Sequence, residues 1–347
     1  MLRSEPADPR PGASQVVGRL APSPTGAQHL GNARTYLLAW LSARAAGGRV
    51  ILRIEDIDSP RVKTWATEQA IADLRWLGLD WDAGPDIGGL HAPYIQTQRV
   101  ERYEAALQEL IQLNFAYPCT CTRRDVESAA SAPHETSWSG GSMTASEPVD
   151  GPVYSGHCSQ WRAGDALPEP GTYCWRFRVP DRVLSVDDRI CGTVELNPAK
   201  QLGDFPLTRK SGQAAYQLAV VIDDASMGVT EVVRGDDLLP SVFRQLPLIE
   251  ALQWSPPNYI HVPLVRGTDG RRLAKRHGDT RLSQYRAAGV TAEQIVGWAA
   301  HSLGLIDVPR PLRAVELIDR FDWSRVQPVE TRVDVEQMNP LFFPPAH

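Results

Sequence analysis

The chain has 347 residues, of which 42% are apolar and 22% charged, as in ordinary globular proteins, and this composition argues against disorder of the whole chain. No stretch reaches the roughly 20 apolar residues of a membrane span, and the polar start lacks the apolar segment of a signal peptide, so we expect a cytoplasmic protein with no membrane partner. The net charge of -5 leaves nucleic acid open as a partner, because a local basic face can still bind phosphates.

The first part of the chain alternates predicted strands and helices. After a disordered tail (1–15), an apolar run at 16–21 predicts a strand, and apolar residues at helical spacing over 29–46 predict a helix that ends at Gly47 and Gly48. A second strand is expected at 49–54, with helices at 64–77 and 97–115. This order is typical of a parallel α/β sheet, and residues 16–117 are predicted to form its first half.

The alternating strand and helix pattern stops over 118–205. Cysteines, a low-complexity loop (128–151) and short β segments (173–179 and 194–196) in this part predict an insertion. The α/β pattern resumes over 206–270, with an apolar segment at 216–222, a helix at 239–252 and a last buried strand at 259–265. The remainder, 271–347, is expected to hold a basic loop and short helices at 283–288 and 291–305.

His29 and Gly31 stand at the first turn of the first predicted helix, directly after a strand and a turn. A helix N-terminus presents unpaired N–H groups and favours an anion such as a phosphate, which Gly31 would let approach closely and to which His29 could donate. A capping histidine on a surface helix is the alternative.

Lys275 lies in the basic, glycine-containing segment 267–279. Only four of the 36 basic residues are lysines, and a mobile lysine suits the stabilisation of a phosphoryl group in transfer. A solvated basic loop is the alternative.

Three carboxylates, Glu55, Asp56 and Asp58, follow the second predicted strand, at the sheet edge where α/β proteins bind ligands. They suit an ammonium group or Mg²⁺, and loop closure by salt bridges is the alternative. In the second half, Arg234 offers a bidentate partner for a carboxylate and Tyr216 a phenol.

The segments HLGN (29–32) and RLAKR (272–276) resemble the HIGH and KMSKS motifs of the class I glutamyl-tRNA synthetase family. LRIEDIDSPR, YPCTCTR, AYQLAVVIDD and TEVVRGDDLL stand between them in the family's order, and the resemblance, which runs from Val17 to about Lys275, is closest to the short glutamyl-Q paralogues. It implies a Rossmann-like parallel sheet with a zinc-containing insertion and a short helical C-terminal region.

The resemblance also implies site residues. His29 and Lys275 would be catalytic, and with Gly31 they would bind ATP, accompanied by Mg²⁺. Ala274 departs from the serine of KMSKS, which puts one hydroxyl contact to ATP in question. The implied glutamate pocket consists of Arg19, Leu20, Ala21, Pro22, Ser23, Glu55, Tyr216 and Arg234.

Cys119 and Cys121, one residue apart, suit a metal better than a disulfide. With Tyr154 and Cys158 they resemble the Cys₃Tyr site that holds one structural zinc ion in the short paralogues. His157 or His134 could take the place of Tyr154. The other two cysteines, Cys174 and Cys191, fall in predicted β segments and are expected to be buried small residues.

The implied partners are L-glutamate, ATP and a tRNA(Asp) that carries queuosine, the base to which a monomeric enzyme would transfer the glutamate. Only 71 residues follow Arg276, fewer than the large helical anticodon-binding region of an ordinary glutamyl-tRNA synthetase requires. Two alternatives remain: a truncated enzyme that charges the 3′ end of tRNA(Glu), and a catalytically silent tRNA- or zinc-binding paralogue. Candidate phosphate contacts are Arg271, Arg272, Arg276 and Arg281.

Overall fold

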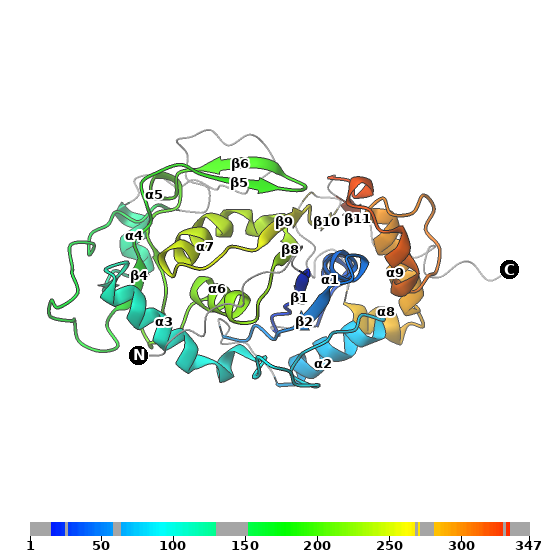
Figure 1. The fold of residues 1–347 in the computed structure, drawn as a ribbon, viewed down its shortest axis with the longest axis horizontal. Helices are drawn as coiled ribbons and strands as arrows, with labels where there is room; N and C mark the ends of the chain where they lie inside the picture. Colours follow the sequence, from blue (N-terminus) through cyan, green and yellow to red (C-terminus); the bar gives the residue numbers. More distant parts are fainter. Residues whose placement is uncertain are drawn as a thin grey trace.

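The computed structural model describes residues 15–24, 27–57, 64–129, 152–267, 270, 281–328 and 331–333. Several residues of the sequence analysis lie outside these ranges: Asp58, His134, Arg271, Arg272, Ala274, Lys275 and Arg276. Figure 1 shows the fold, with the parallel strands at its centre and helices around them.

The first parallel pair joins β1 (Val17–Leu20) to β2 (Arg49–Leu52), with Val17 opposite Arg49. The crossover is α1 (Leu30–Ala45), as predicted. The chain leaves α1 through Gly47, which has φ +63°, and Gly48, where a Cβ would lie 2.3 Å from the carbonyl oxygen of Val16. Only glycine fits this turn, which brings β2 back alongside β1.

The second parallel pair joins β8 (Glu231–Gly235) to β9 (Asn258–Val262) through η2 (Asp236–Leu238) and α7 (Leu239–Ala251). The Thr230 N–H donates to the Val17 carbonyl oxygen at 3.0 Å, so the two pairs lie side by side. The apolar segment at 216–222 belongs to a helix, α6 (Tyr216–Ser226), and β8 is a strand that the sequence analysis missed. A continuously buried apolar run has no periodicity that tells strand from helix.

The last predicted strand, 259–265, is interrupted at Pro263. Proline has no N–H to donate to a ladder, so the chain forms β9 and then a separate β10 (Val265–Gly267). The latter pairs in parallel with β11 (Thr331–Val333), a C-terminal strand that no periodic pattern indicated.

Two further groups of strands are antiparallel. Here β4 (Cys174–Phe177) pairs with β3 (Ala116–Cys119) and with β7 (Phe205–Pro206), while β5 (Leu184–Asp188) and β6 (Gly192–Leu196) form a hairpin. This hairpin runs above α7 in Figure 1. The short helices here are α4 (Arg123–Ala129) and α5 (Pro198–Gln201), and α2 (Thr64–Trp76), η1 (Gln96–Gln98) and α3 (Val100–Gln112) precede them in the chain.

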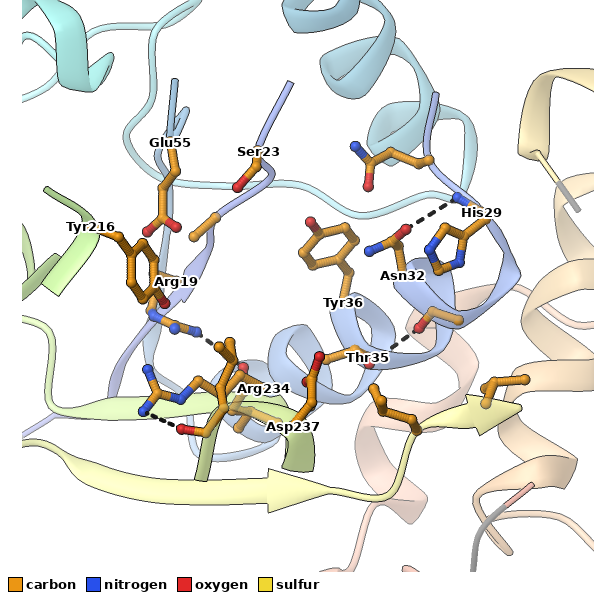
Figure 2. Close-up of a pocket in the computed structure, with 18 of the residues that line it drawn as sticks. Arg19, Ser23, His29, Asn32, Thr35, Tyr36, Glu55, Tyr216, Arg234 and Asp237 are labelled. Carbon is orange, nitrogen blue, oxygen red and sulfur yellow. Dashed lines mark hydrogen bonds between the residues drawn. The ribbon is translucent and has the colours of Figure 1, made fainter. Parts of the chain in front are cut away.

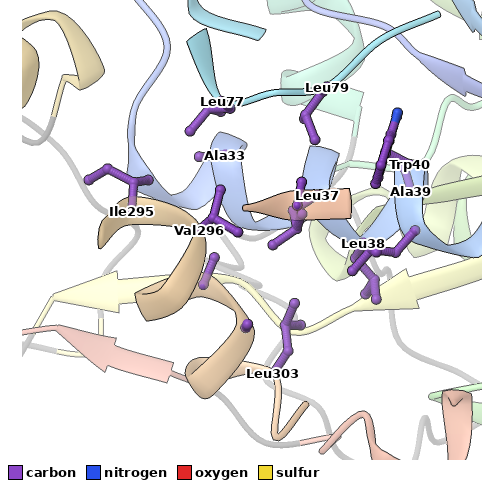
Figure 3. Close-up of a cluster of buried hydrophobic side chains, with 14 of the residues drawn as sticks. Ala33, Leu37, Leu38, Ala39, Trp40, Leu77, Leu79, Ile295, Val296 and Leu303 are labelled. Carbon is purple, nitrogen blue, oxygen red and sulfur yellow. The ribbon is translucent and has the colours of Figure 1, made fainter. Parts of the chain in front are cut away.

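The C-terminal part consists of α8 (Leu282–Ala287), α9 (Ala292–Ser302), η4 (Ala314–Arg320) and η5 (Trp323–Arg325) before β11. Figure 3 shows how α1 packs against α9, with Leu37 and Leu38 buried among Ile295, Val296 and Leu303. Each such leucine contributes roughly 1.5–3 kcal/mol by leaving water. This core fixes the direction of α1, whose first turn opens into a hollow lined by polar residues.

No helix among the described residues is long and apolar enough to span a membrane.

Candidate active site

A cavity of about 450 Å³ lies between the ends of β1 and β8 and the first turns of α1. Figure 2 shows Arg19, Glu55, Tyr216 and Arg234 gathered at one end, and His29 at the other. Parallel strands that end at one edge bring these residues together from sequence positions about 200 apart.

Two buried arginines form one wall of the cavity. Arg19, at 6% exposure, donates from Nη1 to the Val233 carbonyl oxygen at 3.0 Å, and its Nε lies 3.8 Å from Asp224 Oδ1. Arg234, at 4% exposure, leaves its buried Nη1 without a hydrogen-bond partner among the described residues. A buried N–H without an acceptor is costly, and a carboxylate bound in the cavity would satisfy it.

The rest of the Arg234 guanidinium is held by a chain of buried groups. Its Nε donates to His261 Nε2 at 3.0 Å, and its Nη2 donates to Gln245 Oε1 at 3.0 Å. Because His261 Nε2 accepts, its Nδ1 carries the proton and donates to Asp188 Oδ2 at 2.8 Å. Burial lowers the pKa of His261 to about 4, so the ring stays neutral and the tautomer is single.

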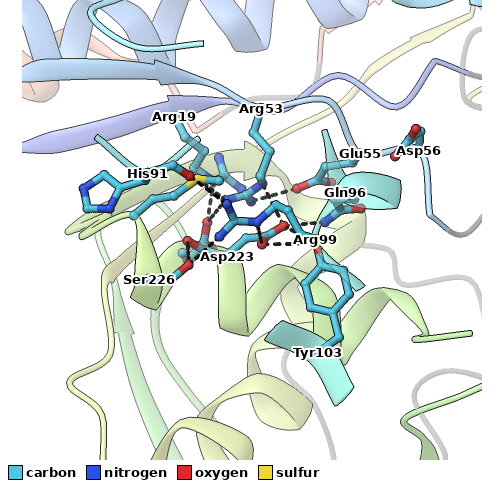
Figure 4. A network of polar contacts seen from close by, with 12 residues as sticks. Arg19, Arg53, Glu55, Asp56, His91, Gln96, Arg99, Tyr103, Asp223 and Ser226 are labelled. Atoms are coloured by element: carbon cyan, nitrogen blue, oxygen red, sulfur yellow. Dashed lines mark hydrogen bonds and ion pairs between the residues drawn. The ribbon is translucent and has the colours of Figure 1, made fainter. Parts of the chain in front are cut away.

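Glu55 belongs to a buried network of charges, shown in Figure 4. Its carboxylate accepts from Arg53 Nη2 at 2.8 Å, and Arg53 also pairs with Asp224 at 2.7 Å, while Arg99 pairs with Asp223 at 2.6 Å. Burial raises the pKa of Glu55, an effect that the Arg53 guanidinium opposes. The network therefore fixes a carboxylate at the cavity wall, where a substrate ammonium could pair with it.

Of the other two predicted carboxylates in this segment, Asp58 lies outside the described residues and Asp56 has a structural role. Asp56 accepts from the Thr97 N–H at 2.8 Å and from its hydroxyl at 2.7 Å, which closes the loop after β2. The alternative of loop closure thus holds for Asp56, with hydrogen bonds in place of the salt bridges expected, while Glu55 faces the cavity.

At the far end, His29 precedes α1, and its N–H donates to Asn32 Oδ1 at 3.2 Å. The imidazole packs against Gly31, where a Cβ would lie 3.2 Å from His29 Cε1. Tyr36, one turn further along α1, stands between the two ends of the cavity (Figure 2). Burial raises the pKa of Tyr36, so its phenol remains a hydrogen-bond donor.

Lys275 lies outside the described residues, but the described residues before and after it in the chain line the cavity or contact residues that do. Val265, in β10, lines the cavity. Further along the chain, Leu282 N donates to the carbonyl oxygen of the lining residue Gln28 at 2.8 Å, and Arg281 forms a backbone bridge with His29.

A second cluster forms in the antiparallel part. The Sγ atoms of Cys119, Cys121 and Cys158 all lie within 4.8 Å of one another, and those of Cys121 and Cys158 are 3.7 Å apart. The Tyr154 hydroxyl lies 3.3 Å from the first sulfur and 3.7 Å from the second. With Zn–S distances of about 2.3 Å, a tetrahedral site places its sulfurs about 3.8 Å apart, so these four atoms fit the corners of such a site.

The chemistry of the donors fits as well. A hydrogen bond from Cys174, helped by Tyr154 and Arg176, lowers the pKa of Cys119 and favours the thiolate. Burial raises the pKa of the Tyr154 phenol, which a bound cation would reverse. His157 is exposed and does not belong to the cluster of ligand atoms, so among the described residues Tyr154 is the better fourth ligand.

The two remaining cysteines, Cys174 and Cys191, differ in burial. Cys174 is buried opposite Cys119 in the β3–β4 ladder, as expected. The expectation for Cys191 is wrong: it is exposed in the turn between β5 and β6, where its thiol donates to the His261 carbonyl oxygen at 3.6 Å. The turn falls between two apolar segments, which made it resemble a strand.

A family profile described as "tRNA synthetases class I (E and Q), catalytic domain" matches residues 15–339. The chain belongs to this class I tRNA synthetase family. It has the α/β catalytic domain of class I synthetases, with parallel strands. A crystal structure of a glutamate tRNA ligase from Elizabethkingia meningosepticum in complex with its amino acid superposes with a TM-score of 0.77 at 29% identity, over 94% of this chain and 68% of that one.

Among curated class I relatives, the chain is 56% identical to a glutamyl-Q tRNA(Asp) synthetase from Rhodopirellula baltica, over 92% of this chain and 97% of the relative. The chain is 49% identical to a protein of the same name from Symbiobacterium thermophilum, over 94% of this chain and 98% of the relative. The glutamate–tRNA ligase 1 of Halorhodospira halophila is 38% identical, over 93% of this chain and 66% of the relative.

The structure of this synthetase family member brings most, but not all, of the expected pocket residues to the cavity. Lining side chains from that set are Arg19, Ala21, Ser23, His29, Gly31, Glu55, Tyr216 and Arg234. Leu20 and Pro22 are buried and do not line it; their carbonyl oxygens accept from the N–H groups of Arg53 and Glu55. Sequence reasoning missed Tyr36 and Asp237 as lining residues, and also His261, which holds Arg234 from behind.

Proposed function

We propose that this protein activates L-glutamate with ATP to form glutamyl-adenylate and transfers the glutamyl group to the queuosine base of tRNA(Asp). The observation that carries the first half is the cavity itself. At one end lie Glu55 and Arg234, which has a buried N–H with no acceptor among the described residues, and at the other end lies a helix N-terminus with His29. A molecule with two carboxylates and an ammonium matches the first end, and phosphates match the second.

The roles follow from the chemistry of each group. Arg19 and Arg234 pair with the substrate's carboxylates, Glu55 with its ammonium, and Tyr216 gives a hydrogen bond. ATP would bind together with Mg²⁺. The α-carboxylate of glutamate attacks the α-phosphorus of ATP and pyrophosphate leaves, while His29 and Lys275 stabilise the charge that develops. A hydroxyl of the queuosine cyclopentene ring then attacks the glutamyl carbonyl carbon, and AMP leaves.

The cysteine cluster would hold one structural Zn²⁺ through Cys119, Cys121, Cys158 and Tyr154. The ion would tie β3 to residues 154–158, which lie far along the chain, and would stabilise this part without entering the reaction. We propose that a single chain carries out the reaction, because residues of one chain line the cavity from both ends.

The second half of the proposal is supported by the relatives named glutamyl-Q tRNA(Asp) synthetase, with identities up to 56%, against 38% for the glutamate–tRNA ligase of H. halophila. The test is to incubate the protein with labelled glutamate, ATP and two preparations of tRNA(Asp), one with queuosine and one without. We expect label only in the first. Equal labelling of both, or labelling of tRNA(Glu) alone, would refute queuosine as the acceptor.

Glutamate-dependent ATP–pyrophosphate exchange without tRNA tests the activation step separately. A catalytically silent paralogue would show none, whereas a truncated glutamyl-tRNA synthetase would show exchange and then label the 3′ end of tRNA(Glu).

A further inference from the structure

The Tyr36 hydroxyl is a polar group of the active-site cavity that the proposed reaction does not use. Tyr36 follows His29 by seven residues, and an α-helix has about 3.6 residues per turn, so both residues lie on the side of α1 that lines the cavity. In Figure 2 the ring stands between His29 at one end and Arg19 and Glu55 at the other, with its hydroxyl directed away from α1. The hydroxyl therefore lies between the end that suits glutamate and the end that suits phosphates.

The ring of Tyr36 is held in place by packing, while its hydroxyl has no partner in the described part of the chain. The side chain is partly buried and packs against the apolar core that includes Leu37 and Leu38. No described residue accepts a hydrogen bond from the Tyr36 hydroxyl. The neighbouring hydroxyl of Thr35 differs, because it donates to the Gly31 carbonyl oxygen at 3.1 Å. The Tyr36 hydroxyl is thus a fixed donor that a bound molecule can use.

Two charged side chains show that the phenol is close to the glutamate end of the cavity. Burial raises the pKa of Tyr36, the Glu55 carboxylate raises it further, and the Arg19 guanidinium opposes the rise. The phenol therefore keeps its proton and can donate it in a hydrogen bond. A substrate ammonium paired with Glu55 would place the glutamyl carbonyl next to it, on the path toward the phosphates at His29. Tyr36 stands on that path (Figure 2).

We propose that the Tyr36 hydroxyl donates a hydrogen bond to the carbonyl oxygen of the glutamyl group and stabilises this oxygen during transfer to the tRNA. The role rests on the proposed function, which brings a glutamyl group to the middle of the cavity.

The transfer step explains why a donor is needed at this oxygen. The attacking tRNA oxygen bonds to the carbonyl carbon, and an electron pair of the C=O bond moves onto the carbonyl oxygen. The pair returns when the bond from carbon to the phosphate oxygen breaks, and AMP leaves with the electrons of that bond. The proton of the attacking hydroxyl passes to a phosphate oxygen of AMP. A donor fixed at the oxygen that carries negative charge lowers the barrier of this step.

The same hydrogen bond gives no comparable advantage in activation. There the glutamate carboxylate loses negative charge as it bonds to phosphorus, so a donor at its second oxygen favours the ground state as much as the transition state. The hydroxyl should therefore matter much more for transfer than for adenylate formation.

The experiment first measures the affinity of two analogues of glutamyl-adenylate by isothermal titration calorimetry. Glutamyl sulfamoyl adenosine keeps the carbonyl oxygen, whereas glutamol adenylate has a CH₂ group in its place. Tyr36→Phe removes only the hydroxyl, and we expect the Kd of the first analogue to rise about 5- to 10-fold through the loss of one hydrogen bond. The Kd of the second analogue should change less than about twofold, because it offers no oxygen to this donor.

The second measurement separates the two steps of the reaction in Tyr36→Phe. ATP–pyrophosphate exchange reports on activation, and we expect its kcat to change less than about threefold. Transfer is measured in a single turnover, from preformed adenylate to the tRNA that the unsubstituted protein labels. We expect its rate to fall by about 10²- to 10³-fold.

The matched control is Tyr173→Phe, which removes a phenol hydroxyl outside the cavity; the Tyr173 ring packs edge-on against Trp175. Its Kd for either analogue should change less than about twofold. Thermal melting reports on folding, and Tyr36→Leu, which also lacks a hydroxyl, decides if Tyr36→Phe does not fold. Equal changes in affinity for both analogues, or a fall in the transfer rate no larger than the fall in exchange, would overturn the proposal.

The two proposals fail in different ways. Absence of glutamate-dependent ATP–pyrophosphate exchange in the unsubstituted protein would refute the proposed function. Normal exchange and transfer in the unsubstituted protein, with no selective effect of Tyr36→Phe, would reject only the role of Tyr36.

Discussion

The chain of buried groups behind Arg234 can be tested with a pair of substitutions at His261. The ring accepts from Arg234 Nε at 3.0 Å and donates to Asp188 at 2.8 Å, and it is 0% exposed. His261→Asn keeps a polar group near Nδ1 and removes the acceptor for Arg234. His261→Gln places an amide near Nε2, where its oxygen can still accept.

A buried charged donor that loses its acceptor costs about 1.5–3 kcal/mol. Arg234 would then turn toward whatever acceptor the cavity offers, and its binding of the substrate carboxylate would weaken by about the same free energy. Since 1.4 kcal/mol corresponds to a factor of ten, we expect the KM for glutamate to rise roughly 10- to 150-fold in His261→Asn. His261→Gln should lose considerably less.

The assay is glutamate-dependent ATP–pyrophosphate exchange at saturating ATP, with the KM for ATP as the internal control. ATP is expected to bind at the His29 end of the cavity, away from Arg234 (Figure 2), so its KM should change less than twofold in both variants. An equal rise for Asn and Gln, or a parallel rise in the KM for ATP, would show that His261 acts only through general stability and would refute a positioning role.

Three further outcomes are expected. Burial lowers the pKa of His261 to about 4 in the folded chain, against 6.5 in the unfolded chain, so its contribution to stability is present above about pH 6.5 and is lost as the pH falls toward 4. In urea titrations we expect this group to make the free energy of unfolding about 2–3 kcal/mol lower at pH 4.5 than at pH 7. The His261→Asn variant should lack this difference. Tyr154→Phe removes a corner of the metal site, and a competing chromophoric chelator should show zinc affinity at least 10- to 100-fold weaker, whereas unchanged affinity would point to another ligand. Gly297→Ala in α9 should lower the free energy of unfolding by about 1–3 kcal/mol, measured by urea titration, because the alanine Cβ would meet the Arg310 carbonyl oxygen at 1.9 Å. Alanine is otherwise the better helix former, so a gain in stability would contradict that close approach.

Local patterns in the sequence were sufficient for the elements whose signals are local. The helix at 29–46 could be predicted because its apolar spacing, the turn before it and the two glycines after it all agree, and α1 ends where they place it. The family motifs in turn indicated Arg19, His29, Glu55, Tyr216 and Arg234, and these line one cavity.

The tertiary structure decided what depends on distant partners. Whether residues 216–222 form a strand or a helix depends on burial from both sides, which a continuous apolar run does not specify. Asp188 and His261 are 73 positions apart, and no local pattern in either segment predicts that they form a hydrogen bond. A sequence records which groups are available, but hydrogen bonds and electrostatic fields act over a few ångströms, so only the folded chain determines which groups meet.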